Sequence, residues 1–188
     1  SAGIGDTYTA CPGIYGGHNW QSATFDAGRN LLFLPVHQLC SDMTPREVDL
    51  GPGGGGYGAD VATYPMPGKE GKAGALLAID VRTMEVKWRV EQAALFLSGA
   101  LSTDGGLLFI GDLDRRFQAF DTETGELRWS TRLPAPAHGY PITFEADAKQ
   151  YVAIPAGIGV FRALTAVIFP DIYQPPDGQG LFVFSLPD

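Results

Sequence analysis

Apolar and polar residues alternate with a period of two along much of the chain, and two such stretches carry the same motif. Residues 78–88 and 119–129 both read Ala-x-Asp-x-x-Thr-x-Glu-x-(Lys/Arg)-Trp. The pattern predicts a half-buried antiparallel hairpin: a strand that ends in Ala-x-Asp, a tight turn at Thr-Met or Thr-Gly, and a second strand that ends in Trp. A repeat near 40 residues with several short strands is typical of a β-propeller blade.

The turn of each motif has recognisable chemistry. We expect Asp80 and Asp121 to accept hydrogen bonds from backbone N–H groups two residues further on. Gly125 is expected to supply the positive φ that such a turn often needs. These positions mark both aspartates as turn residues and not as candidates for catalysis.

Three stretches of the chain combine a strand, an acidic or Gly-containing turn and a short apolar strand of the kind that is buried between sheets. They begin at Thr24, Ser102 and Thr143, and a further strand follows each of them. We therefore predict an all-β chain. It forms one partial propeller, residues 1–188, whose three units lie at about 20–88, 98–129 and 139–186.

The units differ mainly by two insertions, at about 41–73 and 157–179. Both are rich in Gly and Pro and lack periodicity, so we expect long irregular excursions, which in compact domains are usually functional or disordered. Residues 1–17 are expected to be a loop.

Three blades do not close a ring. Propellers have at least four blades, and open sheet edges aggregate unless they are covered. We expect the missing blades to come from another chain or from a cleaved upstream portion of the same one. The chain begins at Ser1 without Met or a signal peptide, which favours a processed product or a subunit.

Composition and charge exclude several function classes. The 188 residues are 45% hydrophobic, which is enough to bury a sizeable core. A formal net charge of −8 argues against a nucleic-acid or anionic-membrane surface, because Lys and Arg are too few to neutralise many phosphates. No run of 18 apolar residues appears, so we predict no membrane span.

The chain has two cysteines, Cys11 and Cys40. Taken alone they are either inert buried thiols or a bridge. A bridge would close a loop of roughly 30 residues, stabilise the fold by ~3 kcal/mol and indicate an oxidising compartment.

The order of several segments carries a family resemblance. The segments are Cys-Pro-Gly-Ile-Tyr-Gly-Gly-His-Asn-Trp (11–20), Cys-Ser-Asp-Met-Thr-Pro (40–45), Tyr-Pro-Met-Pro-Gly-Lys (64–69), both Trp motifs, Gly-Tyr-Pro-Ile-Thr-Phe (139–144), Lys-Gln-Tyr-Val-Ala-Ile (149–154) and Leu-Phe-Val-Phe-Ser (181–185). Together they resemble the C-terminal third of the pyrroloquinoline-quinone (PQQ) alcohol dehydrogenases, the methanol dehydrogenase large-subunit family.

The resemblance implies an eight-bladed periplasmic propeller whose blades interlock through the Trp motifs. PQQ and a Ca²⁺ or lanthanide ion would lie on the ring axis, and Cys11 and Cys40 would be bridged. Such enzymes oxidise an alcohol to an aldehyde or ketone and pass the electrons to a cytochrome c. The family's catalytic Asp and metal ligands lie upstream of this region, so we expect the chain alone to be inactive and to need a larger N-terminal chain.

Four residues are candidates for cofactor contact by the same resemblance. Asn19 falls where the family has an amide that hydrogen-bonds the quinone; a neutral amide can donate without titrating, and the alternative is a loop Asn that caps its own backbone. Trp20 is either a core aromatic or a cofactor contact. Leu97 and Phe161 stand where the family commonly has Trp, which predicts a pocket for an alcohol bulkier than methanol.

The alternative function is a non-catalytic Trp-repeat propeller that acts as a scaffold for protein assembly, because fold alone does not imply chemistry. A third possibility is an electron-transfer or docking subunit, against which the absence of a Cys-x-x-Cys-His heme motif counts. The histidines, His18, His37 and His138, are scattered along the chain. We expect surface or structural roles for them, with only His18 near the site.

Overall fold

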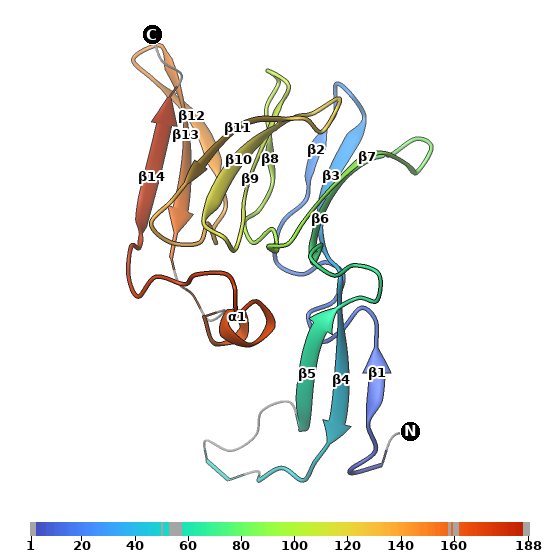
Figure 1. The fold of residues 1–188 in the computed structure, drawn as a ribbon. Helices are drawn as coiled ribbons and strands as arrows, with labels where there is room; N and C mark the ends of the chain where they lie inside the picture. Colours follow the sequence, from blue (N-terminus) through green and yellow to red (C-terminus); the bar gives the residue numbers. More distant parts are fainter. Residues whose placement is uncertain (1–2, 50, 53–57, 158, 160–161, 186–188) are drawn as a thin grey trace.

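The structure is a computed structural model, and it describes residues 3–49, 51–52, 58–157, 159 and 162–185. This part of the chain forms four antiparallel sheets and one short helix (Figure 1). Three sheets stand side by side like the blades of a propeller, and the fourth lies beyond one end of them. The all-β prediction is confirmed, with α1 (Arg162–Ile168) as the helical exception.

Two of the blade-like sheets have four strands and one has three. The first contains, in spatial order, β2 (Thr24–Asp26), β3 (Leu31–His37), β6 (Gly74–Asp80) and β7 (Glu85–Gln92). The second contains β8 (Leu101–Ser102), β9 (Leu107–Gly111), β10 (Arg116–Asp121) and β11 (Leu127–Arg132). The third contains β12 (Ile142–Ala146), β13 (Lys149–Ala156) and β14 (Gly180–Ser185).

Apolar side chains fill the spaces between neighbouring blades. The cluster between the first and second blades includes Phe33, Leu76, Phe96, Ile110 and Phe120. The cluster between the second and third includes Phe117, Leu133, Val152 and Ile154. Burial of these faces is the main favourable contribution to the stacking, since apolar area removed from water stabilises by about 25 cal/mol per Å².

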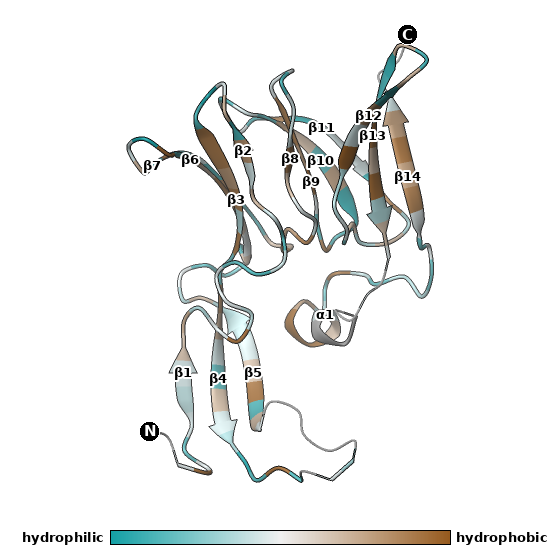
Figure 2. Ribbon diagram, turned by 180° about the vertical axis from the view of Figure 1, so that it is seen from behind, coloured by the Kyte–Doolittle hydropathy of each residue, from teal (hydrophilic) through white to brown (hydrophobic). Residues whose placement is uncertain are grey.

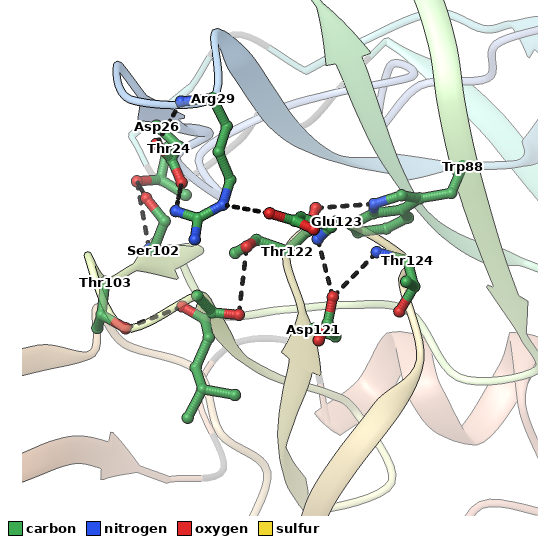
Figure 3. A network of polar contacts seen from close by, with 12 residues as sticks. Thr24, Asp26, Arg29, Trp88, Ser102, Thr103, Asp121, Thr122, Glu123 and Thr124 are labelled. Atoms are coloured by element: carbon green, nitrogen blue, oxygen red, sulfur yellow. Dashed lines mark hydrogen bonds and ion pairs between the residues drawn. The ribbon is translucent and has the colours of Figure 1, made fainter.

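Trp88 joins the first blade to the second (Figure 3). Its indole Nε1 donates to the backbone carbonyl oxygen of Thr122, at 3.0 Å. The ring lies directly over Gly125, where a Cβ atom would stand 2.8 Å from it. The first strands of the two blades also meet, through the hydroxyls of Thr24 and Ser102 at 2.9 Å.

The turns of the two Trp motifs have the predicted chemistry. Asp80 Oδ1 accepts from the backbone N–H of Arg82 at 2.9 Å, and Asp121 Oδ1 accepts from that of Glu123 at 3.0 Å. The φ of Gly125 is 72°, so the predictions for these turns are confirmed. Hydrogen bonds from the side chains of Arg82 and Arg128 lower the pKa of Asp80 and of Asp121 to about 2.

The insertion at 41–73 is not irregular throughout. β4 (Leu39–Pro45) pairs with β5 (Ala59–Pro65), and β1 (Tyr8–Ala10) pairs with the other side of β4. The expectation of loops is therefore wrong for these residues. The strands of this sheet are hard to see in the sequence because polar side chains bond across it. Asp42, for example, accepts a hydrogen bond from Tyr64 Oη at 2.9 Å.

The second insertion contains α1, whose last turn continues into a hydrogen bond from Phe169 N to Thr165 O at 2.8 Å. Phe169 packs into an apolar cluster with Leu95 and Leu113 at the end of the blades. Among the described residues, no helix has the length and apolar character needed to cross a membrane.

Candidate functional site

All the insertions leave the blades at one end, which we call the loop face (Figure 1). The loop face comprises the described residues 11–22, 38–49, 51–52, 58–73, 93–100, 112–115, 133–141, 157, 159 and 162–179. The loops that lead into the first strand of each blade belong to it, whereas the short turns of the Trp motifs lie at the opposite end. Candidate residues from distant parts of the sequence therefore lie on one side of the molecule.

A disulfide fixes the first segment of the loop face. Cys11 and Cys40 are bonded, with their Cα atoms 4.5 Å apart, which confirms the bridge implied by the family resemblance. Backbone hydrogen bonds continue this anchorage, from Gly13 N to Leu39 O at 2.8 Å and from His37 N to Gly17 O at 2.7 Å. The loop that carries Asn19 is thus tied at one end to β4 of the fourth sheet and further along to the end of β3 in the first blade.

Asn19 is exposed at the end of this loop. Its Nδ2 donates one hydrogen bond, to the backbone oxygen of Tyr15 at 3.2 Å. This contact is the one expected of an Asn that caps its own loop. A carboxamide has two N–H donors and an acceptor oxygen, so one donor is used and the remaining groups can still face a ligand.

Trp20 follows Asn19 and lies between two histidines. Its ring centroid is 6.3 Å from that of His37 and 6.0 Å from that of His138. The structure therefore gathers histidines that the sequence scatters, and His138 joins this site unexpectedly. Trp20 also packs against the apolar cluster that contains Leu97, so two of the predicted residues share one cluster.

Both histidines beside Trp20 are held in the neutral form. Burial, and secondarily the nearby charge of His18, lowers the pKa of His37 to about 4. Burial also lowers the pKa of His138. At pH 7 neither ring supplies a positive charge, so the recognition chemistry at this point of the loop face is that of neutral donors and aromatic surface.

Leu97 lies within the described residues, whereas Phe161 does not. Leu97 is 1% exposed and its backbone N–H donates to Gly111 O at 3.0 Å. Its side chain therefore acts through the packing of the cluster beneath Trp20. Phe161 lies outside the described residues; Gly159 nearby lies against the ring of His138.

Tyr140 is a residue of this site that the sequence analysis did not single out. Its hydroxyl donates to the backbone oxygen of Trp20 at 2.8 Å, across 120 residues of sequence. Gly99 lies beneath it, because a Cβ there would stand 2.6 Å from both the Tyr140 ring and Ser22 Oγ. A signal was available in the sequence. Tyr140 comes shortly before the first strand of the third blade, just as Asn19 and Leu97 come shortly before the first strands of the first and second blades.

A buried carboxyl also stands on the loop face. Asp112 is fully buried in the turn after β9; its Oδ1 accepts from Arg116 N at 2.8 Å, and its Oδ2 accepts from Gln92 at 3.0 Å and Gln118 at 3.3 Å. Burial raises the pKa of Asp112 to about 6. Through these hydrogen bonds Asp112 stabilises the turn between β9 and β10.

No group of three or more His, Cys, Asp or Glu residues that could hold a metal ion occurs in the described ranges. The polar groups around Trp20 include the amide of Asn19, the rings of His37 and His138 and the hydroxyl of Tyr140. This set suits hydrogen bonding to a neutral or partly anionic ligand better than it suits a hard cation, which prefers several carboxylate or carbonyl oxygens.

Comparisons with known proteins show what this chain is similar to. The model of the glucose/ethanol/alcohol dehydrogenase PQQ β-propeller domain matches residues 61–152. Methanol dehydrogenase (cytochrome c) subunit 1 of Paracoccus denitrificans is 32% identical over 173 residues, which are 90% of this chain and 27% of that protein. A lanthanide-dependent methanol dehydrogenase of Methylacidiphilum fumariolicum strain SolV is 34% identical over 156 residues, 82% of this chain and 26% of that protein.

The solved structures agree with this similarity. A europium-containing methanol dehydrogenase superposes on this chain with a TM-score of 0.87 and 29% sequence identity. The match covers 98% of this chain and 36% of the dehydrogenase chain. The four sheets therefore align with part of a larger propeller. The chain spans about a quarter of the length of the curated relatives it matches.

Proposed function

Because the chain carries a PQQ-type β-propeller domain that matches a portion of the quinoprotein alcohol dehydrogenases, we propose that it is one part of such an enzyme. Its three blade-like sheets form three blades of an eight-bladed ring. A larger N-terminal chain, or a cleaved upstream portion, supplies the other blades. The complete ring oxidises an alcohol to an aldehyde or ketone, and this chain alone is inactive.

The observation that carries the proposal is the position of Asn19. The Cys11–Cys40 bridge and the hydrogen bond from His37 N to Gly17 O fix the loop. That loop presents an exposed amide on the face where the insertions gather. A propeller that served only as a scaffold has no need of this arrangement, and the relatives named above are dehydrogenases, so we favour the enzyme.

The residues present fit one edge of a quinone cofactor. Asn19 has a second N–H that can donate to a quinone oxygen, and a neutral amide does so without changing its protonation state. Trp20 contributes aromatic surface, held in place by Tyr140 and by the ring of His138. When bound, PQQ supplies a two-electron acceptor.

The remaining parts of the active site belong to the rest of the ring. We assign the catalytic Asp and the ligands of a Ca²⁺ or lanthanide ion to it, as the family resemblance implies. Leu97 lies in the cluster that supports Trp20, and we propose that it and Phe161 leave room for an alcohol bulkier than methanol.

The electron acceptor and the compartment follow the relatives. Methanol dehydrogenase subunit 1 is named with cytochrome c as its acceptor, and we propose a cytochrome c here too. The disulfide supports an oxidising compartment, for which we propose the periplasm.

The test is a substitution in the assembled complex. Asn19→Ala removes the amide, and loss of one hydrogen bond predicts PQQ affinity about tenfold weaker in an absorbance titration of the cofactor-free complex. Lys87→Ala, an exposed change on β7, is the control and should bind as the wild type does. If the Asn19→Ala complex binds PQQ as tightly as the wild type does, Asn19 does not contact the cofactor.

A further inference from the structure

Hydrogen bonds join the loops that lead into the three blades. We call these the entry loops; they precede β2, β8 and β12 and comprise residues 11–22, 93–100 and 133–141. Figure 2 shows the blades side by side, with the entry loops at their lower ends. Ala100 N in the second loop donates to Ser22 O in the first at 2.9 Å, and Gly99 N donates to Gly139 O in the third at 3.1 Å. Neighbouring entry loops are therefore joined through backbone groups.

Tyr140 makes a different contact, because it joins the entry loops of the first and third blades, which are not neighbours. Its Oη donates to Trp20 O at 2.8 Å. To reach that oxygen, the Tyr140 ring lies over the second entry loop at Gly99, where a Cβ atom would stand 2.6 Å from the ring. The hydrogen bond thus depends on a glycine at this position, which lets the ring approach the backbone closely.

The carbonyl that Tyr140 holds belongs to the residue directly after Asn19. Peptide units are planar, so only the φ and ψ of Trp20 lie between the held carbonyl and the peptide that follows Asn19. On the other side of Asn19, Gly17 O accepts from His37 N at 2.7 Å. Asn19 therefore lies between two fixed points, one on the first blade and one provided by the Tyr140 hydroxyl of the third.

Loss of the Tyr140 hydroxyl would lengthen the segment that is free to move. The next residue toward β2 whose backbone oxygen accepts a hydrogen bond from another entry loop is Ser22, two positions after Trp20. The number of soft backbone dihedrals around Asn19 would therefore increase, and each additional conformation that the amide visits lowers the population of the one that suits a ligand.

We propose that Tyr140 is a positioning residue for the candidate cofactor contact. Its hydroxyl holds the segment of Asn19 and Trp20 in the conformation in which the Asn19 amide can donate to a quinone oxygen. The third blade thereby contributes to the site through the loop of the first. The inference rests on the proposed function for the identity of the ligand, whereas the hydrogen bond and its effect on the segment belong to this chain.

The first measurement is hydrogen–deuterium exchange in the assembled complex without cofactor. Tyr140→Phe removes the hydroxyl and keeps the ring over Gly99. We expect the Ala100 amide, which donates to Ser22 O, to exchange about fivefold faster in this variant. The Gly125 amide donates to Asp121 O at the opposite end of the blades and should exchange as in the wild type.

The second measurement is a double-mutant cycle on PQQ affinity, by absorbance titration of the cofactor-free complex. Tyr140→Phe should weaken binding by about threefold to tenfold in the wild-type background. In the Asn19→Ala background it should cause no further loss, because the amide that it positions is gone. The control is Tyr173→Phe on the same face; the contact of Tyr173 with Arg115 is made by its ring, which the substitution keeps.

The two measurements distinguish the positioning role from the proposed function. If Ala100 exchanges at the wild-type rate in Tyr140→Phe while Asn19→Ala weakens PQQ binding, the positioning role is wrong and the proposed function stands. If Tyr140→Phe weakens binding equally in both backgrounds, Tyr140 acts independently of Asn19 and the positioning role is again wrong. If exchange is faster but neither substitution changes PQQ affinity, Tyr140 orders the segment and the cofactor contact assigned to Asn19 is wrong.

Discussion

The indole Nε1 of Trp88 donates a hydrogen bond to the backbone oxygen of Thr122, in the next blade, at 3.0 Å. The two residues are 34 positions apart in sequence, and the bond connects one motif to the other. Because the ring also lies over Gly125, the contact fixes the angle between the blades as well as their distance. The repeated motif is thus a device for stacking blades.

Replacement of Trp88 by Phe should destabilise the chain. The variant loses the hydrogen bond and leaves Thr122 O without its partner, so we expect the free energy of unfolding in urea to fall by about 1–3 kcal/mol. Trp129→Phe is the matched control. Trp129 is partly exposed, and its loss should cost under about 1 kcal/mol in the free chain. Equal losses in the two variants would show that docking contributes nothing.

The two motifs differ at the turn, which allows an opposed pair of substitutions. Gly125→Ala places a Cβ 2.8 Å from the Trp88 ring at a φ of 72°, and should lower the free energy of unfolding by about 1–3 kcal/mol. Met84 occupies the equivalent turn position with a φ of 60° and is 74% exposed. Met84→Gly should raise stability by about 0.5 kcal/mol, since it relieves left-handed backbone strain. Thermal unfolding of both variants measures the contrast, and a loss in Met84→Gly would contradict it.

Asp112 should make stability depend on pH between 4 and 6. Its pKa is raised from 3.8 to about 6 by burial, so the folded chain binds this proton more tightly than the unfolded chain. The contribution of Asp112 is therefore fully present below pH 3.8 and is lost as the pH rises through about 6. Asp112→Asn cannot ionise, and Gln92 and Gln118 can rotate their amides to accommodate it.

The measurement compares the wild type with Asp112→Asn in urea at pH 4 and pH 7. The stability of the variant relative to the wild type should increase with pH by an amount on the order of 2 kcal/mol. The charged side chains of Asp114 and Arg116 beside this carboxyl are common to both proteins, so their effects largely cancel in the comparison. A pH-independent difference would mean that Asp112 is already ionised at low pH.

Removal of the disulfide should loosen the candidate site. Cys11→Ser with Cys40→Ala opens a loop that spans 29 positions and should lower the free energy of unfolding by ~3 kcal/mol on the chain-entropy account. Reductant should produce a similar loss in the wild type and none in the variant. If reductant leaves the free energy of unfolding of the wild type unchanged, the disulfide does not stabilise the fold.

The sequence predicted the features that are local and repeated. Asp80, Asp121 and Gly125 act through neighbours within a few positions, so the motif alone was enough to predict their turn contacts. The buried strands β3 and β9 were visible as apolar runs because both of their faces are covered. The structural role of a residue could therefore be predicted from the sequence where that role depends only on its near neighbours in the chain.

The parts that sequence did not predict depend on contacts between distant segments. The gathering of His37 and His138 around Trp20 joins residues more than 100 positions apart, and neither histidine lies in a recognisable motif. The sheet built from β1, β4 and β5 was missed because its strands are joined by polar cross-strand hydrogen bonds and lack a continuous apolar run. The bridge between Cys11 and Cys40 came from family resemblance, since two cysteines alone left the pairing open.

The most direct test of the central claim is native mass spectrometry of the chain purified from its own cells under non-reducing conditions, together with an absorbance spectrum. Membership in a quinoprotein alcohol dehydrogenase predicts a complex with a larger chain, a bound quinone that absorbs in the near ultraviolet, and one disulfide in this chain. A lone 20.1 kDa species without quinone would contradict the proposed function.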